Sequence, residues 1–239
     1  MPLLAENLAR LEDAIAAACR AANRPREEIE LVAVSKNHPT STIVEAVRVG
    51  LRLFGENRVQ EFAAKSVELA ATLVRGQMRV HLIGHLQSNK AAKAAEIFDA
   101  VDSVDSLKLA ERLDEAAGRL QRRLPILLEI KLSPEESKAG LEPDSREMNE
   151  LLERLPSLTN LDARGLMTIA PLEVSRDETR ACFRELRLLR ERLAAAHPKL
   201  NLPVLSMGMS GDFPLAIQEG ATRIRVGTAL FGERPGYAQ

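Results

Sequence analysis

A lysine stands at the end of an apolar stretch near the start of the chain. Residues 31–35 are Leu-Val-Ala-Val-Ser, Lys36 follows them, and the turn-like sequence Asn-His-Pro comes next at residues 37–39. Because β-branched and apolar residues are typical of a buried strand, Lys36 is expected at a strand end. Partial burial lowers the pKa of a lysine amine and makes the neutral nucleophile more available. Lys36 is therefore a candidate for bonding to a carbonyl group, although by itself it is better explained as a solvated lysine.

Two segments near the end of the sequence are rich in residue types that can bind anions. Residues 205–212 are LSMGMSGD and residues 223–232 are RIRVGTALFG. Glycine lets backbone N–H groups approach a ligand closely, and hydroxyl groups donate hydrogen bonds to oxyanions. Either segment alone is explained as a tight turn, but both together, after the last two strands of a barrel, favour a phosphate site. The candidates are Ser206, Ser210, Gly227 and Thr228, with Arg225 just before the second turn.

A nucleophilic lysine and a phosphate site in one fold suggest a phosphorylated aldehyde held as a Schiff base. Pyridoxal 5'-phosphate (PLP) is the obvious cofactor of this kind. A sugar-phosphate aldolase has the same two features, but it usually carries its lysine on a later strand than Lys36. His81 and His85 could also be metal ligands, but no carboxylate or cysteine cluster accompanies them, so we expect no metal site.

These residues require elements that bring them together. Short apolar runs alternate with amphipathic helical patterns about eight times, which predicts parallel strands joined by right-handed crossovers. Eight strands in 239 residues favour an α/β fold of the closed (β/α)8 TIM-barrel type, with an extra N-terminal helix, over an open doubly wound sheet. Chemistry in such a barrel lies at the carboxyl ends of the strands. The predicted strands are 30–36, 51–57, 78–84, 98–104, 125–131, 161–169, 201–208 and 221–228.

The composition limits the class of protein. The chain is 45% hydrophobic and 28% charged with a formal net charge of −1, as expected of a globular protein and not of a disordered or nucleic-acid-binding one. Charges interrupt every apolar run well before about 18 residues, so we expect no membrane span. Residues 1–20 have the charge spacing of an amphipathic helix and not of a signal peptide. Cys19 and Cys182 form neither a metal motif nor a disulfide framework, which favours a cytoplasmic protein.

Seven short motifs occur in order between Leu31 and Gly232. They are LVAVSK, FGENRVQE, HLIGHLQSNK, VDSVDS, RGLMTI, LSMGMSGDF and RIRVGTALFG. As a set they resemble the PLP homeostasis protein family, also called the YggS or proline synthase co-transcribed family, whose members resemble the N-terminal barrel of bacterial alanine racemase. The resemblance implies a single alanine racemase-like (β/α)8 barrel domain over residues 1–239.

The resemblance also implies roles for residues around the ring and aldehyde of PLP. Lys36 matches the lysine that holds PLP as a Schiff base, and Arg225 matches an arginine that faces the pyridine nitrogen. Asn57 and Met167 match residues near the cofactor. Because a permanently charged guanidinium discourages protonation of the ring nitrogen, the ring would be a poor electron sink. From its charge alone, Arg225 could equally form a structural salt bridge.

For the phosphate group, the resemblance implies a second set of residues. Ser210 matches a phosphate-binding serine after the seventh strand, with Ser206 as a weaker candidate. Gly227 and Thr228 match the phosphate-binding turn after the eighth strand. Gly211 stands where relatives often carry a polar residue, which should affect the mobility of the loop more than cofactor binding.

The choice between a carrier and an enzyme depends on a second proton-transfer group opposite the lysine. In alanine racemase this group is a tyrosine from a second, all-β domain, whereas the only tyrosine here is Tyr237, near the end of the sequence. The expected function is therefore intracellular PLP homeostasis, with a monomer that buffers the cofactor or delivers it to PLP-dependent apoenzymes. The alternative is a PLP-dependent amino-acid racemase or related enzyme in which a residue such as His85 supplies the second base.

Three further lysines could hold a second PLP molecule transiently. They are Lys90, Lys131 and Lys138, which follow predicted strands near the expected barrel mouth. Each of them is better explained as a solvated lysine.

Overall fold

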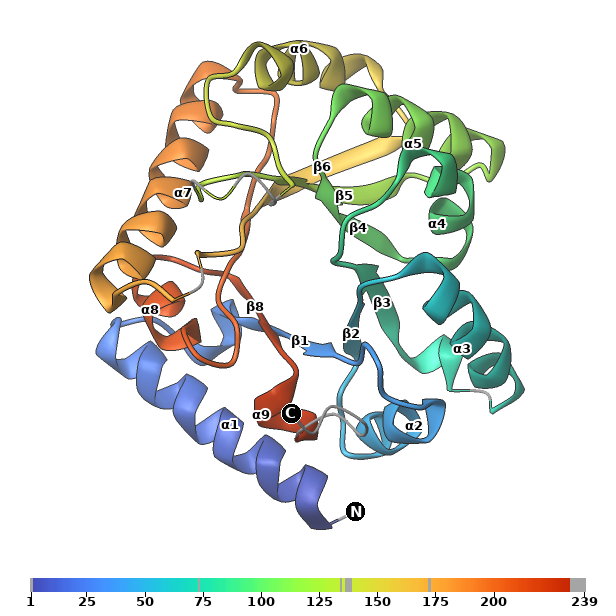
Figure 1. Ribbon diagram of the computed structural model, residues 1–239, viewed down its shortest axis with the longest axis vertical. Helices are drawn as coiled ribbons and strands as arrows, with labels where there is room; N and C mark the ends of the chain where they lie inside the picture. The colour runs from blue at the N-terminus through green and yellow to red at the C-terminus, as the bar shows by residue number, and fades with distance from the viewer. Residues whose placement is uncertain (1, 73, 134, 136–138, 172, 233–239) are drawn as a thin grey trace.

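The chain folds into a closed barrel of eight parallel strands (Figure 1). The computed structural model describes residues 2–72, 74–133, 135, 139–171 and 173–232. Each strand pairs with the next, and β8 closes the barrel by pairing with β1 from Glu30↔Arg223 to Ala33↔Val226. This closure confirms the predicted TIM barrel and rules out the open sheet. The strands are β1 Glu30–Val34, β2 Leu53–Glu56, β3 Arg79–Leu82, β4 Ala100–Val104, β5 Leu124–Glu129, β6 Leu161–Met167, β7 Val204–Ser206 and β8 Arg223–Val226.

Helices surround the barrel (Figure 1). The α-helices are α1 Pro2–Ala21, α2 Thr40–Arg48, α3 Val59–Ala71, α4 Ala91–Ile97, α5 Leu107–Arg119, α6 Arg146–Arg154, α7 Arg176–Ala196, α8 Phe213–Gln218 and α9 Thr228–Phe231. Short 3-10 turns are η1 Arg26–Glu28, η2 Arg75–Gln77, η3 Ser88–Lys90 and η4 Leu155–Ser157. The predicted extra helix is α1, which precedes β1 and contacts α8 and α9. In the described part of the chain, no helix has both the length and the apolar character that a membrane crossing requires.

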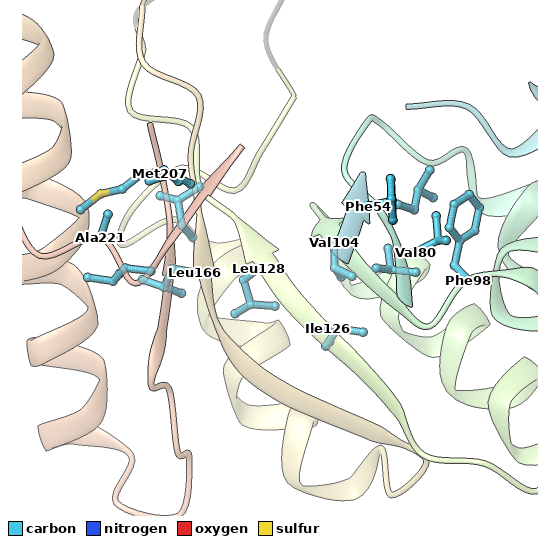
Figure 2. Packing of buried hydrophobic residues seen from close by; sticks show 14 of the residues in the cluster. Phe54, Val80, Phe98, Val104, Ile126, Leu128, Leu166, Met207 and Ala221 are labelled. Carbon is cyan, nitrogen blue, oxygen red and sulfur yellow. The ribbon is translucent and has the colours of Figure 1, made fainter. Parts of the chain in front are cut away.

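The core lies between the strands and the inner faces of the helices. Figure 2 shows Phe54, Val80 and Phe98 gathered in one part of this packing, and all three side chains are fully buried. The ring of Phe98 also lies 4.9 Å, centroid to centroid, from the ring of Phe62 on α3. Burial of large aromatic and branched side chains is the main favourable contribution to the stability of such a fold.

An ion network ties four strands together at the amino end of the barrel. Arg223 on β8 donates to Asp102 on β4 over 2.9 Å and to Glu30 on β1 over 2.7 Å. His81 on β3 lies 3.3 Å from the same Asp102 carboxylate. Burial alone would raise the pKa of Asp102, but the nearby His81 and Arg223 outweigh it and hold that pKa at about 2. His81 therefore has a partner at the end of the barrel away from Lys36, and its role there is structural.

Candidate functional site

A cavity of about 250 Å³ lies at the carboxyl end of the barrel strands. Six of the eight residues predicted to bind the cofactor line it: Lys36, Asn57, Ser210, Arg225, Gly227 and Thr228. Because all the strands are parallel, their following loops meet at one end, and residues almost 200 positions apart share one wall. Ser206 and Met167 are not among the lining residues, and both side chains are fully buried.

The backbone before Lys36 is held by a buried ion pair. The Ser35 hydroxyl donates to Glu56 at the end of β2 over 2.8 Å. Lys65 on α3 donates to the same carboxylate oxygen over 2.8 Å and to the Ser35 carbonyl over 2.9 Å. Burial raises the pKa of Glu56, and the Lys65 cation opposes that rise. The turn from β1 into the Lys36 loop is therefore fixed by groups from β2 and α3.

The backbone after Lys36 is held by the same lysine on α3. Lys65 also pairs with Glu61 over 2.7 Å, and Glu61 accepts a hydrogen bond from the Asn37 N–H over 2.6 Å. Asn37 has a φ of 63°, in the left-handed region that asparagine tolerates better than most residues. Lys36 thus lies between two anchored neighbours, which limits the positions that its amine can reach.

Arg225 presents a fixed cation to the cavity from β8. One guanidinium nitrogen donates to the Ser206 hydroxyl over 2.8 Å, and another donates to the Thr168 carbonyl over 2.9 Å. Burial lowers the pKa of Arg225, and the Asp102 carboxylate is the strongest of the groups that oppose this. Both hydrogen-bond partners are neutral, so they orient the guanidinium without pairing its charge directly. Ser206, our weaker candidate for the phosphate, accepts this hydrogen bond from Arg225 and is not among the residues that line the cavity.

The loops after β7 and β8 approach each other closely. The Ala229 N–H, in the first turn of α9, donates to the Ser210 hydroxyl over 3.4 Å. Gly208 has a φ of 94°, and a Cβ atom there would lie 2.6 Å from the Ala216 side chain on α8. A Cβ atom on Gly227 would lie 3.3 Å from the Val34 carbonyl, so this glycine keeps the last turn close to β1. The result is a small polar wall of hydroxyl and backbone N–H groups beside the Lys36 loop.

Asn57 supplies an unsatisfied polar atom. Its Oδ1 atom is buried and has no hydrogen-bond partner within the described part of the chain. A Cβ atom on Gly84 would lie only 2.5 Å from the Asn57 carbonyl, so Gly84 permits the close packing that sets the position of Asn57. Ser103 on β4 fixes this turn by donating to the Gly84 carbonyl over 2.7 Å. An orphaned buried acceptor at a cavity wall is typical of a ligand-binding position.

Sequence reasoning missed several of the residues that line this cavity. Ile169, two residues beyond Met167, reaches the cavity where we expected Met167 to do so. His38 also lines it and packs on the Phe231 ring of α9, with ring centroids 5.1 Å apart. The turn-like Asn-His-Pro sequence after Lys36 was a signal for His38, since turn residues after a barrel strand face the mouth.

A second cavity of about 530 Å³ adjoins the first one. It shares Asn57, Ile83 and Ile169 with the first cavity, and it extends toward the loop after β5. Its other lining residues are Gly84, His85, Glu129, Ile130, Lys131, Leu132, Ser133 and Ala139. The barrel mouth therefore has two adjoining compartments.

The remaining predicted residues are distributed over the molecule. Lys131 lines the second cavity, whereas Lys90 ends η3 and lines neither of the two. His85 is exposed and lies 2.9 Å from the Asp105 carboxylate. Lys138 and Tyr237 are outside the described residues. In the described ranges, no group of three or more histidine, cysteine, aspartate or glutamate residues could hold a metal ion.

Comparison with known proteins defines the class of this fold and site. The family model of the alanine racemase N-terminal domain matches residues 7–235, which places the chain in that class of barrels. A pyridoxal phosphate homeostasis protein of Pseudomonas aeruginosa is 42% identical over 234 residues, covering 98% of this chain and 97% of that protein. The chain therefore belongs to the pyridoxal phosphate homeostasis protein family.

Solved structures agree with this assignment. PipY of Synechococcus elongatus PCC7942, solved with PLP bound, is 47% identical and superposes with a TM-score of 0.81, covering 96% of this chain and 100% of PipY. An alanine racemase of Clostridium difficile superposes with a TM-score of 0.74 at 18% identity, covering 99% of this chain and 58% of the racemase. The second likeness is one of fold alone.

Proposed function

We propose that this protein binds PLP in the smaller cavity and serves in PLP homeostasis. The observation that carries the proposal is the combination in one cavity of a lysine amine, a buried arginine and a wall of hydroxyl and glycine N–H groups. These three kinds of group can bind an aldehyde, a pyridine ring nitrogen and a phosphate, respectively. The PLP bound to PipY, 47% identical to this chain, supports the same ligand here.

Each residue has a role that follows from its chemistry. Lys36 would hold the cofactor covalently, because PLP supplies an aldehyde that condenses with a primary amine. Ser210, Gly227 and Thr228 would bind the phosphate through hydroxyl and backbone N–H donors. Asn57, with its orphaned Oδ1 atom, would accept a hydrogen bond at the edge of the ligand. Met167 and Ser206 are buried and do not line the cavity, so they would support the lining residues by packing and hydrogen bonding.

Arg225 would decide what the bound cofactor can do. Its guanidinium is held in place by Ser206 and the Thr168 carbonyl and does not lose its proton at physiological pH. A fixed cation at the pyridine nitrogen keeps that nitrogen unprotonated, which weakens the ring as an acceptor of electrons. This favours storage and delivery of the cofactor over carbanion chemistry.

The wider role would be to hold PLP and transfer it to PLP-dependent apoenzymes. The chain would work as a monomer in the cytoplasm, with a single alanine racemase-like barrel domain over residues 1–239. Its pyridoxal phosphate homeostasis relatives support the cofactor role.

The first test is the absorption spectrum of the protein with PLP, followed by borohydride reduction and peptide mass mapping. We expect a visible absorption band and a phosphopyridoxyl mass on the peptide that contains Lys36. A protein that gains no band on addition of PLP would contradict the proposed function. A label on another lysine would show that this other lysine, and not Lys36, forms the Schiff base, while PLP binding itself would stand.

A further inference from the structure

The larger of the two cavities at the barrel mouth contains a carboxylate that the proposed PLP site does not use. Glu129, the last residue of β5, is only 7% exposed and lines this cavity. Its Oε2 atom is buried and has no hydrogen-bond partner in the described ranges. Leaving a buried acceptor unpaired destabilises a fold, so such a group at a cavity wall is a candidate position for binding a hydrogen-bond donor.

The surroundings of Glu129 set the kind of ligand that it would accept. Burial, assisted by the Asp105 carboxylate on the loop after β4, raises the pKa of Glu129 to about 7, and only the Arg225 cation opposes this rise. Asp105 already holds His85 at 2.9 Å, and Arg225 is held by Ser206 and the Thr168 carbonyl. The acceptor is therefore unpaired and lies near another carboxylate, which favours a cationic hydrogen-bond donor.

The position and lining of the second cavity indicate which kind of cation would bind there. It shares Asn57, Ile83 and Ile169 with the cavity that contains Lys36. A group bound beside Glu129 would therefore be next to the proposed PLP site. Apolar residues form much of the wall, among them Ile130 and Leu132, which suits a ligand with an aliphatic part.

From this geometry we propose that the second cavity binds the ammonium group of a primary amine, with Glu129 as its acceptor. A primary amine is the chemical class that competes with Lys36 for an aldehyde, so this inference rests on the proposed PLP function and adds the place where the recipient amine binds. Two sources share this chemistry: a free α-amino acid and a lysine side chain of a recipient protein. Lys131 lies in the same wall, 3.6 Å from Glu142. It could pair with the carboxylate of a free amino acid, whereas a lysine side chain of a protein carries no carboxylate for it to bind.

The experiment measures binding of two probes to protein prepared without PLP, by calorimetry or NMR titration. The probes are Nα-acetyl-L-lysine amide, which has a side-chain ammonium and no carboxylate, and L-alanine. We expect saturable binding that Glu129→Gln weakens by about 10- to 100-fold, the scale of losing a hydrogen bond to a charged group. Glu96→Gln on α4 is the control, because it removes the same charge from an exposed residue that lines neither cavity.

The pH dependence gives a second readout. Between pH 6 and pH 8 the ionised fraction of a carboxyl with a pKa of about 7 rises about tenfold, and probe affinity should rise with it. The charged or titratable groups facing Glu129 are Asp105, Arg225, His85 and Lys131. All four remain in Glu129→Gln, so any pH dependence that they cause persists in this variant, whereas the part that belongs to Glu129 disappears.

The outcomes separate this inference from the proposed function. Equal probe binding by the wild type and Glu129→Gln, or no binding of either probe, would overturn the amine site even if PLP still loads and reduces onto Lys36. Glu129-dependent probe binding by a protein that takes up no PLP would overturn the proposed function and retain the amine site. Tighter binding of L-alanine that Lys131→Met weakens assigns the site to a free amino acid, and preference for the lysine amide assigns it to a protein side chain.

Discussion

At the scale of single residues, the site depends on side chains whose burial makes them unusual. Lys36 follows a buried strand, Arg225 is a buried cation with neutral partners, and Glu129 is a buried carboxyl with an unpaired oxygen. A buried polar group without full compensation costs stability, so such groups concentrate where they bind ligands. Two predictions concern these side chains directly.

Replacement of Lys36 by alanine should abolish the borohydride-reducible PLP adduct and leave the fold intact. The side chain lies on a cavity wall and is partly exposed, so its loss removes the amine and little packing. Mass mapping after reduction checks the adduct, and circular dichroism checks the fold. Lys131→Ala should keep the adduct, and a persistent adduct in Lys36→Ala would mean that another lysine is the anchor.

Replacement of Glu129 by glutamine should stabilise the protein above neutral pH. The folded-state pKa of about 7 exceeds the ordinary value of 4.5, so the favourable contribution of the neutral form is full below pH 4.5 and is lost as the pH rises through about 7. At pH 8 the free energy of unfolding of Glu129→Gln should therefore exceed that of the wild type by about 1–3 kcal/mol.

Urea unfolding of both proteins at pH 8 and pH 5 measures this difference. We expect it to shrink toward pH 5, where the wild-type carboxyl is mostly neutral in the folded state. A constant difference across this range would show that the carboxyl does not titrate there.

At the scale of elements, the site is assembled by contacts between neighbouring strand–helix units. Lys65 on α3 holds the residues on both sides of Lys36, and the Ala229 N–H joins the loops after β7 and β8 through Ser210. These contacts come from elements that the barrel topology makes adjacent. Lys65→Met tests what the first contact contributes to stability, and Ser210→Ala tests what the second contributes to PLP retention.

Replacement of Lys65 by methionine should destabilise the fold by about 3–5 kcal/mol, because it leaves a buried carboxylate without its cation. The carboxylate is that of Glu56, which is fully buried and accepts from Lys65 over 2.8 Å. Urea unfolding checks the loss, and Lys93→Met, which removes an exposed partner of Glu96, is the matched control. The double variant Lys65→Met/Glu56→Gln should recover part of the stability, and failure to recover any would point to lost packing instead.

Replacement of Ser210 by alanine should weaken PLP retention by about 1–3 kcal/mol, the usual scale for losing a hydrogen bond to a charged group. The reason is that the serine hydroxyl lines the cavity and lies within hydrogen-bonding distance of the first turn of α9. Equilibrium dialysis gives the dissociation constant, and Ser157→Ala on η4, away from both cavities, serves as the control. An unchanged constant in Ser210→Ala would move the phosphate site elsewhere.

At the scale of the whole molecule, closure of the barrel links the first strand to the last one. The lysine loop follows β1 and the phosphate-type turn follows β8, and these two strands are hydrogen-bonded neighbours. A ligand held at both loops would therefore join the loops that follow the first and last strands. Binding of such a ligand should therefore stabilise the whole barrel against unfolding.

Saturation with PLP should raise the melting temperature of the wild type. A ligand that binds only the folded state stabilises it by about 2.7 kcal/mol at one hundred times its dissociation constant, which corresponds to several degrees for a domain of this size. Differential scanning calorimetry at increasing PLP concentration measures the shift. The shift should be much smaller in Lys36→Ala, and an equal shift in both proteins would mean that PLP binds away from the Lys36 cavity.

The sequence by itself determined the repeating alternation of strands and helices, the extra first helix and six of the residues that line the smaller cavity. Apolar periodicity follows from which faces are buried, so eight strand segments could be located before their pairing was known. Parallel strands then place the residues after them at one end, which explains why Lys36, Asn57 and Gly227 could be predicted together.

Only the tertiary structure decided which of these side chains reach the cavity and which support it. The depth of a side chain along a strand cannot be deduced from residue spacing. Ile169 therefore lines the cavity wall where Met167 was expected, and Ser206 accepts a hydrogen bond from Arg225 without lining the cavity. The unpaired oxygen of Glu129 gave no sequence signal at all, because a glutamate at a strand end is unremarkable until the packing around it is known. The burial and the hydrogen-bond partners of a side chain are properties of the folded chain, and they distinguish a solvated charge from a group that can bind a ligand.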